Sequence, residues 1–196
     1  MKTEIVQSSS QISVEDAVVL FLDLQAGIVE LTQTNPVERL RKAVSALGKL
    51  ATLFDLPVVV SAVREQGRDA VMLPEIESAI GSYAVQYRTT CDAFQNETVM
   101  ERIRATGRRT VLISGVATEL AVQLPALAAS DAGLQAYVVV DACGGMSERT
   151  EQAAFLRMGQ AGVAPVSVMT LAGELAGDFR EPRAQQAIGI LYEMAG

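Results

Sequence analysis

Six apolar runs of strand length recur along the chain, and segments with helical periodicity separate them. Several of the runs are continuous stretches of β-branched residues rather than alternations of apolar and polar positions. That pattern is typical of strands buried on both faces, as in parallel sheets. We therefore predict strands at residues 17–23, 57–63, 84–88, 110–116, 136–142 and 164–170.

The segments between these runs carry the signals of amphipathic helices. Residues 36–54 place their apolar side chains on one stripe, with Asn35 as the expected N-cap and Pro36 at the first helical position. Further helices are expected to end at Gly107 and to run from Ser147 to Gly162. Repeated strand–helix units predict a doubly wound α/β sheet with right-handed crossovers. Because no linker or internal repeat interrupts them, residues 1–196 are expected to form a single domain.

Composition and charge exclude several classes of function. The chain has 196 residues, of which 49% are hydrophobic and 20% charged, as in a globular protein. Its net charge of -7 argues against nucleic acid as a partner, since basic clusters supply that affinity. No apolar run approaches the ~20 residues of a membrane span, and the N-terminus lacks the apolar core of a signal peptide. We therefore expect a cytoplasmic protein without a membrane partner.

The chain contains no histidine, and this absence restricts the available chemistry. Neither a Ser-His-Asp nor a Cys-His arrangement can form, and imidazole cannot serve as a metal ligand. The two cysteines, Cys91 and Cys143, are too few for a disulfide framework or a zinc cluster. Any general acid or base must be a carboxylate, lysine, tyrosine or cysteine, and we expect no metal and no other cofactor.

In doubly wound sheets, ligands bind outside the carboxyl ends of the strands. Three of the polar residues at such ends also have a structural interpretation. Asp23 and Asp141 would cap the turns that follow them, and Arg88 would be a solvated strand end. The polar residues predicted at this edge are Asp23, Gln25, Arg64, Glu65, Arg88, Thr118, Glu119 and Asp141.

Four stretches of the sequence resemble the isochorismatase-like hydrolases, also called cysteine hydrolases. They read, in order, VVLFLDLQAG, YRTTCDAF, LISGVATELAVQLPALAASDAG and YVVVDAC. The resemblance extends from Ala17 to about Phe179. It implies a three-layer α/β/α sandwich around a central, mostly parallel six-stranded sheet, in agreement with the pattern of strands and helices.

The resemblance also implies positions for a catalytic triad of aspartate, lysine and nucleophilic cysteine. The aspartate corresponds to Asp23. The lysine position, five residues before the alanine of the pair Ala93-Phe94, is Arg88, and the cysteine position, six residues after the glycine of GVATE, is Ala121. The chain therefore departs from the family pattern at two of the three positions.

The same resemblance implies a non-proline cis peptide at Val116–Ala117, whose neighbouring amides would help to form an oxyanion hole. The substrate-binding candidates are Gln25, Arg64, Val116, Ala117 and Thr118. Within the helix that begins near Thr118, Pro125 lacks an N–H, so the carbonyl of Ala121 loses its regular helical partner and we expect a bend.

Three hypotheses of function follow. Alanine cannot form a thioester, and a guanidinium stays charged and only stabilises anions. Isochorismatases, as the resemblance implies, also lack the cysteine and hydrolyse a vinyl ether. The first hypothesis is therefore a hydrolase of a small molecule, without a covalent cysteine step, in which Asp23 is the general acid or base and Arg88 the anion stabiliser.

The second hypothesis is a catalytically silent relative that binds a small molecule or serves in an assembly. The third, a thiol moved to Cys91, ranks last because no base other than Asp23 is identifiable.

A homo-oligomer is expected from the C-terminal segment, whose apolar side chains suggest a subunit interface. The family resemblance points the same way, since family members commonly form dimers, tetramers or larger rings. The residues concerned are Ile188, Ile190, Leu191 and Met194.

Overall fold

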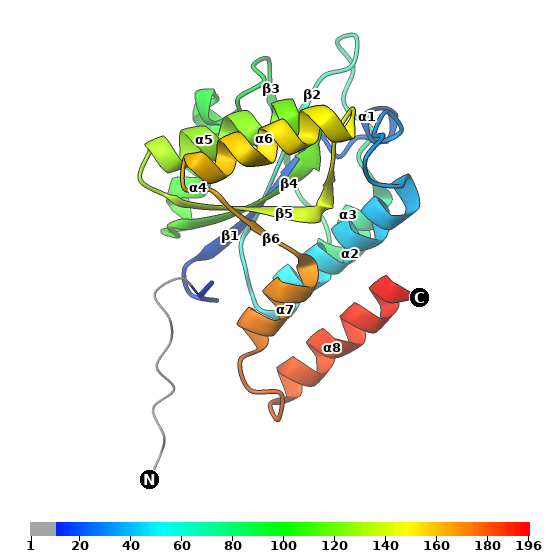
Figure 1. Ribbon diagram of the computed structural model, residues 1–196, viewed down its shortest axis with the longest axis vertical. Coiled ribbons are helices and arrows are strands. Elements are labelled where there is room, and N and C mark those ends of the chain that lie inside the picture. The colour runs from blue at the N-terminus through cyan, green and yellow to red at the C-terminus, as the bar shows by residue number, and fades with distance from the viewer. Residues whose placement is uncertain (1–10) are drawn as a thin grey trace.

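A central sheet of six parallel strands organises the chain (Figure 1). The computed structural model describes residues 11–196. The order of the strands is β3-β2-β1-β4-β5-β6, and all five pairings are parallel. The strands are β1 (Ala17–Leu22), β2 (Val58–Val63), β3 (Val85–Arg88), β4 (Thr110–Val116), β5 (Gln135–Gly144) and β6 (Ala164–Val166).

Helices cover both faces of the sheet and complete three layers (Figure 1). One face carries α2 (Val37–Leu53), α7 (Val168–Ala176) and α8 (Pro182–Ala195). The other carries α4 (Glu97–Ala105), α5 (Gln123–Asp131) and α6 (Glu148–Gln160). The short elements are α1 (Ala26–Val29), α3 (Pro74–Ile80), the 3-10 turn η1 (Ala93–Gln95) and the π-helical turn η2 (Thr118–Val122). The predicted three-layer fold is confirmed. Within residues 11–196, no helix combines the length and apolarity needed to cross a membrane.

The central strand β1 shows why its sequence is apolar without alternation. All six of its residues are fully buried. Val19 and Phe21 pack in the cluster with α2 and α7, whereas Leu20 and Leu22 pack in the cluster with α4, α5 and α6. A strand with a helix layer on each side has no solvent face, so both of its faces must be apolar. Fully burying each large side chain contributes about 1.5–3 kcal/mol.

Most of the predicted helix ends are confirmed. Ser147 caps α6, and its hydroxyl accepts a hydrogen bond from the Thr150 amide at 3.2 Å. Gly107 and Gly162 lie just past α4 and α6 with φ of 68° and 82°, the left-handed conformation that glycine adopts without steric cost.

The predicted N-cap of the helix at residues 36–54 is wrong by one residue. Pro36 is the N-cap of α2, and Asn35 does not cap the helix. Instead, the Asn35 side-chain amide donates to the carbonyl oxygens of Asp141 at 2.8 Å and Cys143 at 2.9 Å. Asparagine at this point ties the loop before α2 to the end of β5, a long-range contact that local sequence does not reveal.

The predicted strand at residues 164–170 is also too long. β6 ends at Val166, and α7 begins at Val168. Ser167 caps this helix by accepting a hydrogen bond from the Thr170 amide at 3.1 Å. The carboxylate of Asp141 accepts the Val168 amide at 2.9 and 3.2 Å. Two acceptors thus satisfy amides at the helix N-terminus, and this capping ends the strand despite the apolar residues that follow.

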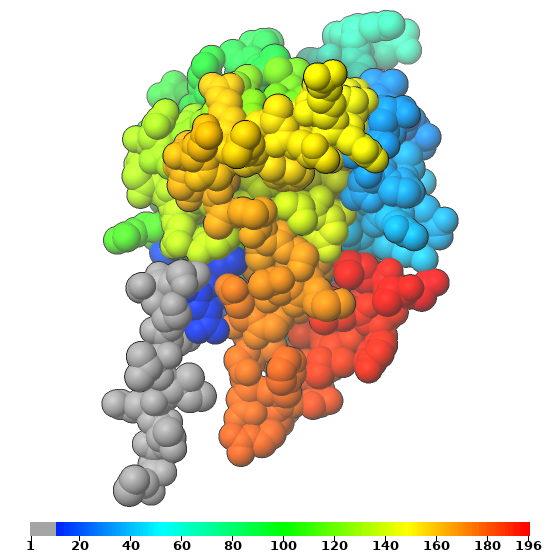
Figure 2. All heavy atoms as spheres, in the orientation of Figure 1, coloured from blue at the N-terminus to red at the C-terminus, as the bar shows by residue number. Residues whose placement is uncertain are grey.

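The C-terminal helix α8 packs on α2 and α7. Ile190, Leu191 and Met194 are partly buried against the core on that side of the sheet. Lys49 pairs with Glu193 at 2.5 Å, and Asp55 pairs with Arg183 at 2.8 Å. Three of the four apolar side chains expected to lie at a subunit interface therefore already cover the core of their own chain in part. In Figure 2, α8 (red) lies beside α7 (orange).

Candidate functional site

The strand order places a topological switch point between β1 and β4. From β1 the chain adds β2 and β3 on one side of the sheet, and then adds β4, β5 and β6 on the other. Helices therefore leave the carboxyl ends of β1 and β4 in opposite directions, and the crevice between them is where doubly wound sheets bind ligands. Asp23 directly follows β1, and Ala117 directly follows β4.

The central feature of this edge is a buried ion pair between Asp23 and Arg88. Nη1 of Arg88 donates to Oδ1 of Asp23 at 2.8 Å, and Nη2 donates to Oδ2 at 2.5 Å. The side chain of Arg88 is 0% exposed and that of Asp23 is 8% exposed. Bidentate pairing of a guanidinium with a carboxylate is among the strongest arrangements of charge-assisted hydrogen bonds.

The pair spans three strands of the sheet. Arg88 ends β3 and Asp23 follows β1, so the guanidinium reaches across β2, where Ser61 is fully buried. The Ser61 hydroxyl lies 3.4 Å from Nη1 of Arg88 and donates to the carbonyl of Gln86 at 2.8 Å. Nε of Arg88 is buried and has no hydrogen-bond partner in the described part of the chain. Ser61 was not predicted, although a lone polar residue inside the apolar run VVVSAV is the signal that could have found it.

The backbone at Asp23 is left-handed, with φ of 51°. Its amide donates to the carbonyl of Ser61 at 3.1 Å, which holds the turn against β2. A non-glycine residue in this conformation costs about 1–3 kcal/mol and is common at functional sites. The alternative interpretation of Asp23 as a helix cap is wrong, because α1 has no side-chain cap and both oxygens of Asp23 face Arg88.

The turn after β4 lies at the same edge of the sheet, on the other side of the switch point. The Val116–Ala117 peptide bond is cis, as expected. The π-helical turn η2 follows and contains Ala121, which is 3% exposed. Pro125 lies in α5, which continues directly from η2 at Gln123. The turn ahead of the proline is π-helical, and the expected bend of the helix stays a prediction.

Two acidic residues anchor this turn to the start of α6. The hydroxyl of Thr118, which is fully buried, donates to Glu151 at 2.7 Å. Glu119 accepts the Met146 amide at 2.9 Å and the Thr150 hydroxyl at 2.7 Å. Thr118 was predicted as a substrate-binding residue, but its hydroxyl already has a partner within the protein. The contributions of Glu151 and Thr150 were missed, since they come from a helix that begins 30 residues later in the chain.

Glycine is required at position 115 because two strands approach closely there. A β-carbon on Gly115 would lie 2.3 Å from the carbonyl oxygen of Leu22, a distance that no backbone contact tolerates. The absence of a side chain lets the end of β4 lie directly against the end of β1. Glycine at this point of GVATE therefore sets how closely the ends of β1 and β4 approach.

The remaining substrate-binding candidates have structural partners. Gln25 is fully buried, accepts the Val63 amide at 3.1 Å and donates to Glu65 at 2.7 Å. The guanidinium of Arg64 stacks 4.2 Å above the ring of Tyr87 and pairs with Asp69. Consecutive residues of a strand point to opposite faces of the sheet, so Tyr87 and Arg88 of β3 lie on opposite faces. Arg64, which stacks on Tyr87, is therefore not on the face that Arg88 occupies.

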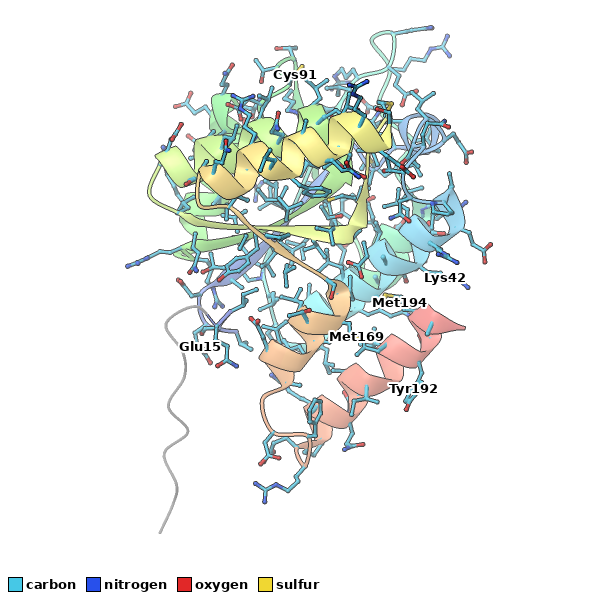
Figure 3. All side chains as sticks on the ribbon, viewed as in Figure 1. Glu15, Lys42, Cys91, Met169, Tyr192 and Met194 are labelled. Atoms are coloured by element: carbon cyan, nitrogen blue, oxygen red, sulfur yellow. The ribbon has the colours of Figure 1, made fainter. Side chains whose placement is uncertain are left out.

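The two cysteines lie in opposite environments. Cys143 is buried in β5, and burial raises the pKa of its thiol far above the ordinary value, which makes it inert as a nucleophile. Cys91 is exposed on the loop after β3 (Figure 3). No hydrogen bond joins Cys91 to Asp23 among the described residues. Residues 11–196 also contain no cluster of three or more histidine, cysteine, aspartate or glutamate side chains that could hold a metal ion.

Comparison with known proteins identifies the family. The Isochorismatase domain profile matches residues 17–170, and the chain belongs to this family. Over 166 residues it is 34% identical to the Escherichia coli protein described as Probable hydrolase YcaC, covering 84% of this chain and 80% of that protein.

Two solved structures share the fold at high similarity. The YcaC gene product of Escherichia coli, described as an octameric hydrolase of unknown specificity, superimposes with a TM-score of 0.85 at 32% identity and covers 96% of this chain and 90% of its own. YcaC from Pseudomonas aeruginosa, solved with hexane-2,5-diol and covalent acrylamide, gives a TM-score of 0.88 at 28% identity and covers 96% of each chain.

We predict that Asp23→Asn destabilises the protein by about 3–5 kcal/mol, because it leaves the buried charge of Arg88 uncompensated. Asp55→Asn is the matched control, since Asp55 also has a positive φ of 56° and an arginine partner but is exposed. Its loss should stay below about 1 kcal/mol. Urea denaturation measures both, and equal losses would show that the buried pair is not the stabilising interaction inferred here.

We also predict a pH dependence from Asp141. Burial raises its pKa above the ordinary 3.8, although the Val168 amide and other backbone hydrogen bonds lower it. The folded state then binds more protons than the unfolded chain from about pH 4 upward, so this group's contribution to stability falls as pH rises through the raised pKa. The difference in unfolding free energy between wild type and Asp141→Asn should therefore decrease between pH 4 and pH 7. A difference that grows over this range contradicts the assignment.

Proposed function

We propose that this protein is a hydrolase of the isochorismatase family that acts on a small molecule without a covalent cysteine step. The observation that carries the proposal is the Asp23–Arg88 pair, which lies at the carboxyl edge beside the switch point of the sheet. Ala121, in the turn after β4, stands at the position where the family resemblance implies a cysteine. Its methyl group cannot attack a substrate, so water must be the nucleophile.

The geometry of the pair suggests the role of each partner. Both oxygens of Asp23 accept hydrogen bonds from the guanidinium, an arrangement of an ionised carboxylate. Each oxygen keeps a second lone pair, so Asp23 can accept a proton from water while that water attacks the substrate. Arg88 supplies a fixed positive charge that stabilises the developing anion. To act as an acid in vinyl-ether hydrolysis, Asp23 would first have to release one of its contacts with Arg88.

A second candidate function, a catalytically silent binding or assembly protein, rests on the burial of the same residues. In the single chain, the side chains of Asp23 and Arg88 are 8% and 0% exposed, and Ala121 is 3% exposed. A pair covered to this extent can hold the sheet edge together without meeting a substrate. The two candidates thus differ in whether the pair becomes accessible, and an activity measurement separates them.

We further propose that residues 1–196 form one domain and that the chain assembles as a homo-oligomer. The single sheet supports one domain. The octameric state of the Escherichia coli relative supports the assembly. A small molecule is favoured over nucleic acid as the substrate because the chain carries a net charge of -7.

The activity test is a panel of amides, imides and vinyl ethers assayed with wild type, Asp23→Asn and Asp55→Asn. We expect wild type to hydrolyse at least one class and Asp23→Asn to lose about 10²–10⁴ in kcat/KM, the usual contribution of a positioned acid or base. Asp55→Asn should retain wild-type rates. Circular dichroism at the assay temperature establishes that each variant is folded. Wild type that turns over none of the three classes supports the silent candidate instead.

The role assigned to position 121 is tested by Ala121→Cys. The introduced thiol should react with iodoacetamide faster than an unperturbed cysteine at pH 7, because Arg88 and the helix that follows favour a thiolate. Peptide mapping counts it separately from the native cysteines, Cys91 and Cys143. Labelling also requires that position 121, which is 3% exposed in the single chain, opens to the reagent. Adding Arg88→Lys should raise amide hydrolysis further, since lysine can deliver a proton to the leaving amine. A thiol no faster than an unperturbed one would refute the nucleophile assignment, and a double variant no better than the single would refute the role of the lysine.

A further inference from the structure

A cavity of about 580 Å³ lies between α2, α3 and α8 and shares no residue with the Asp23–Arg88 site. Its volume is within the range of about 300–1,000 Å³ typical of small-molecule sites. Lys42 and Met194, which line the cavity from α2 and α8, are labelled in Figure 3. The established family resemblance assigns nothing to this part of the molecule.

The cavity combines an apolar floor with a polar wall. Val37 and Ala46 of α2 and Ile190 and Met194 of α8 supply apolar surface. The α2 residues that line it recur at three- and four-residue spacing along one side of the helix, so they form a continuous stripe. Their positions are 37, 38, 41, 42, 45, 46 and 49. A mostly apolar lining with a few convergent polar groups is the usual composition of a ligand site.

The charged residues that line the cavity form three ion pairs, Arg41–Glu75, Lys42–Glu38 and Lys49–Glu193. Arg41, Lys42 and Lys49 are 39%, 36% and 40% exposed, so their side chains lie along the wall. Glu38 and Glu193, their acidic partners at the rim, are 83% and 65% exposed and extend into solvent. Glu75, the third acidic residue of the lining, is 24% exposed and holds Arg41. The free donors of a cation, and not the net charge of the wall, would therefore attract an anion.

Arg41 has the donors to hold such an anion. Only its Nε is used, in a hydrogen bond to Oε1 of Glu75 at 2.8 Å, and its two terminal nitrogens have no protein partner in the described part of the chain. The other oxygen of Glu75 is buried and unpartnered, so Glu75 fixes the arginine without competing at the solvent side. Planar terminal nitrogens held in this way match a carboxylate in bidentate geometry.

We propose that this cavity binds a small organic acid, with the carboxylate on the terminal nitrogens of Arg41 and an apolar body on the floor formed by Val37, Ala46, Ile190 and Met194. The site goes beyond the proposed hydrolase function, because no residue of the cavity takes part in the Asp23–Arg88 pair. It accepts monocarboxylates with an aliphatic or aromatic body.

The probes are 4-phenylbutyrate, its amide and 4-phenylbutylamine, which share the apolar body and differ in the head group. Isothermal titration should show the carboxylate binding about tenfold more tightly than the amide, as a charge-assisted hydrogen bond to arginine provides. The amine should bind more weakly than either. Equal affinity of acid and amide, tighter binding of the amine, or no binding of the acid would overturn the proposal.

Variants locate the binding at Arg41. Arg41→Gln should lower the affinity for 4-phenylbutyrate about tenfold and leave that for the amide unchanged. Arg39→Gln is the matched control, because Arg39 lies on the same helix, is exposed and does not line the cavity. Should Arg41→Gln unfold, the double variant Arg41→Gln, Glu75→Gln removes the ion pair without leaving a single charge behind. Retention of the preference for the acid in either variant would place the ligand elsewhere.

Discussion

The bidentate ion pair of Asp23 and Arg88 is the interaction on which the carboxyl edge of the sheet depends. It joins the end of β1 to the end of β3 across β2, with Ser61 as an additional acceptor beneath the guanidinium. Removing two charges from water is costly, and the pair persists because each charge neutralises the other in good geometry. The left-handed turn at Asp23 is part of the same arrangement, since it follows β1 immediately and directs the carboxylate toward β3.

This pair also limits the chemistry available at the site. With both oxygens of Asp23 engaged, the carboxylate is suited to accepting a proton from water more than to donating one. Arginine in place of lysine contributes a permanent charge and no proton. In the proposed assignment, alanine at position 121 and arginine at position 88 leave the site without the nucleophile and the proton donor that the family resemblance implies. The proposed function therefore relies on water as the nucleophile, and the burial of the pair makes access of substrate to Asp23 the deciding question.

Sequence patterns predicted the fold well where the physical cause was local. The continuous apolar run of β1 and the glycines after α4 and α6 are set by burial on two faces and by backbone sterics. The errors fall where a distant residue changes the outcome. Asn35 bonds to β5 instead of capping α2, and Asp141 caps α7 across the sheet edge, which shortens β6. The contacts that join Thr118 to Glu151 and Glu119 to the Met146 amide were hidden for the same reason.

The sequence by itself determined the class of fold, the absence of imidazole chemistry and the identity of the residues at the three family positions. Those properties depend on periodicity and on side-chain type, which are local and can be counted. Only the tertiary structure decided that Asp23 and Arg88 form a closed pair and that the groups of Gln25 and Thr118 are used within the protein. It also decided that a cavity opens between α2 and α8. Hydrogen-bond partners, burial and cavities depend on which elements pack together, and residues far apart in the chain meet only when the sheet has formed.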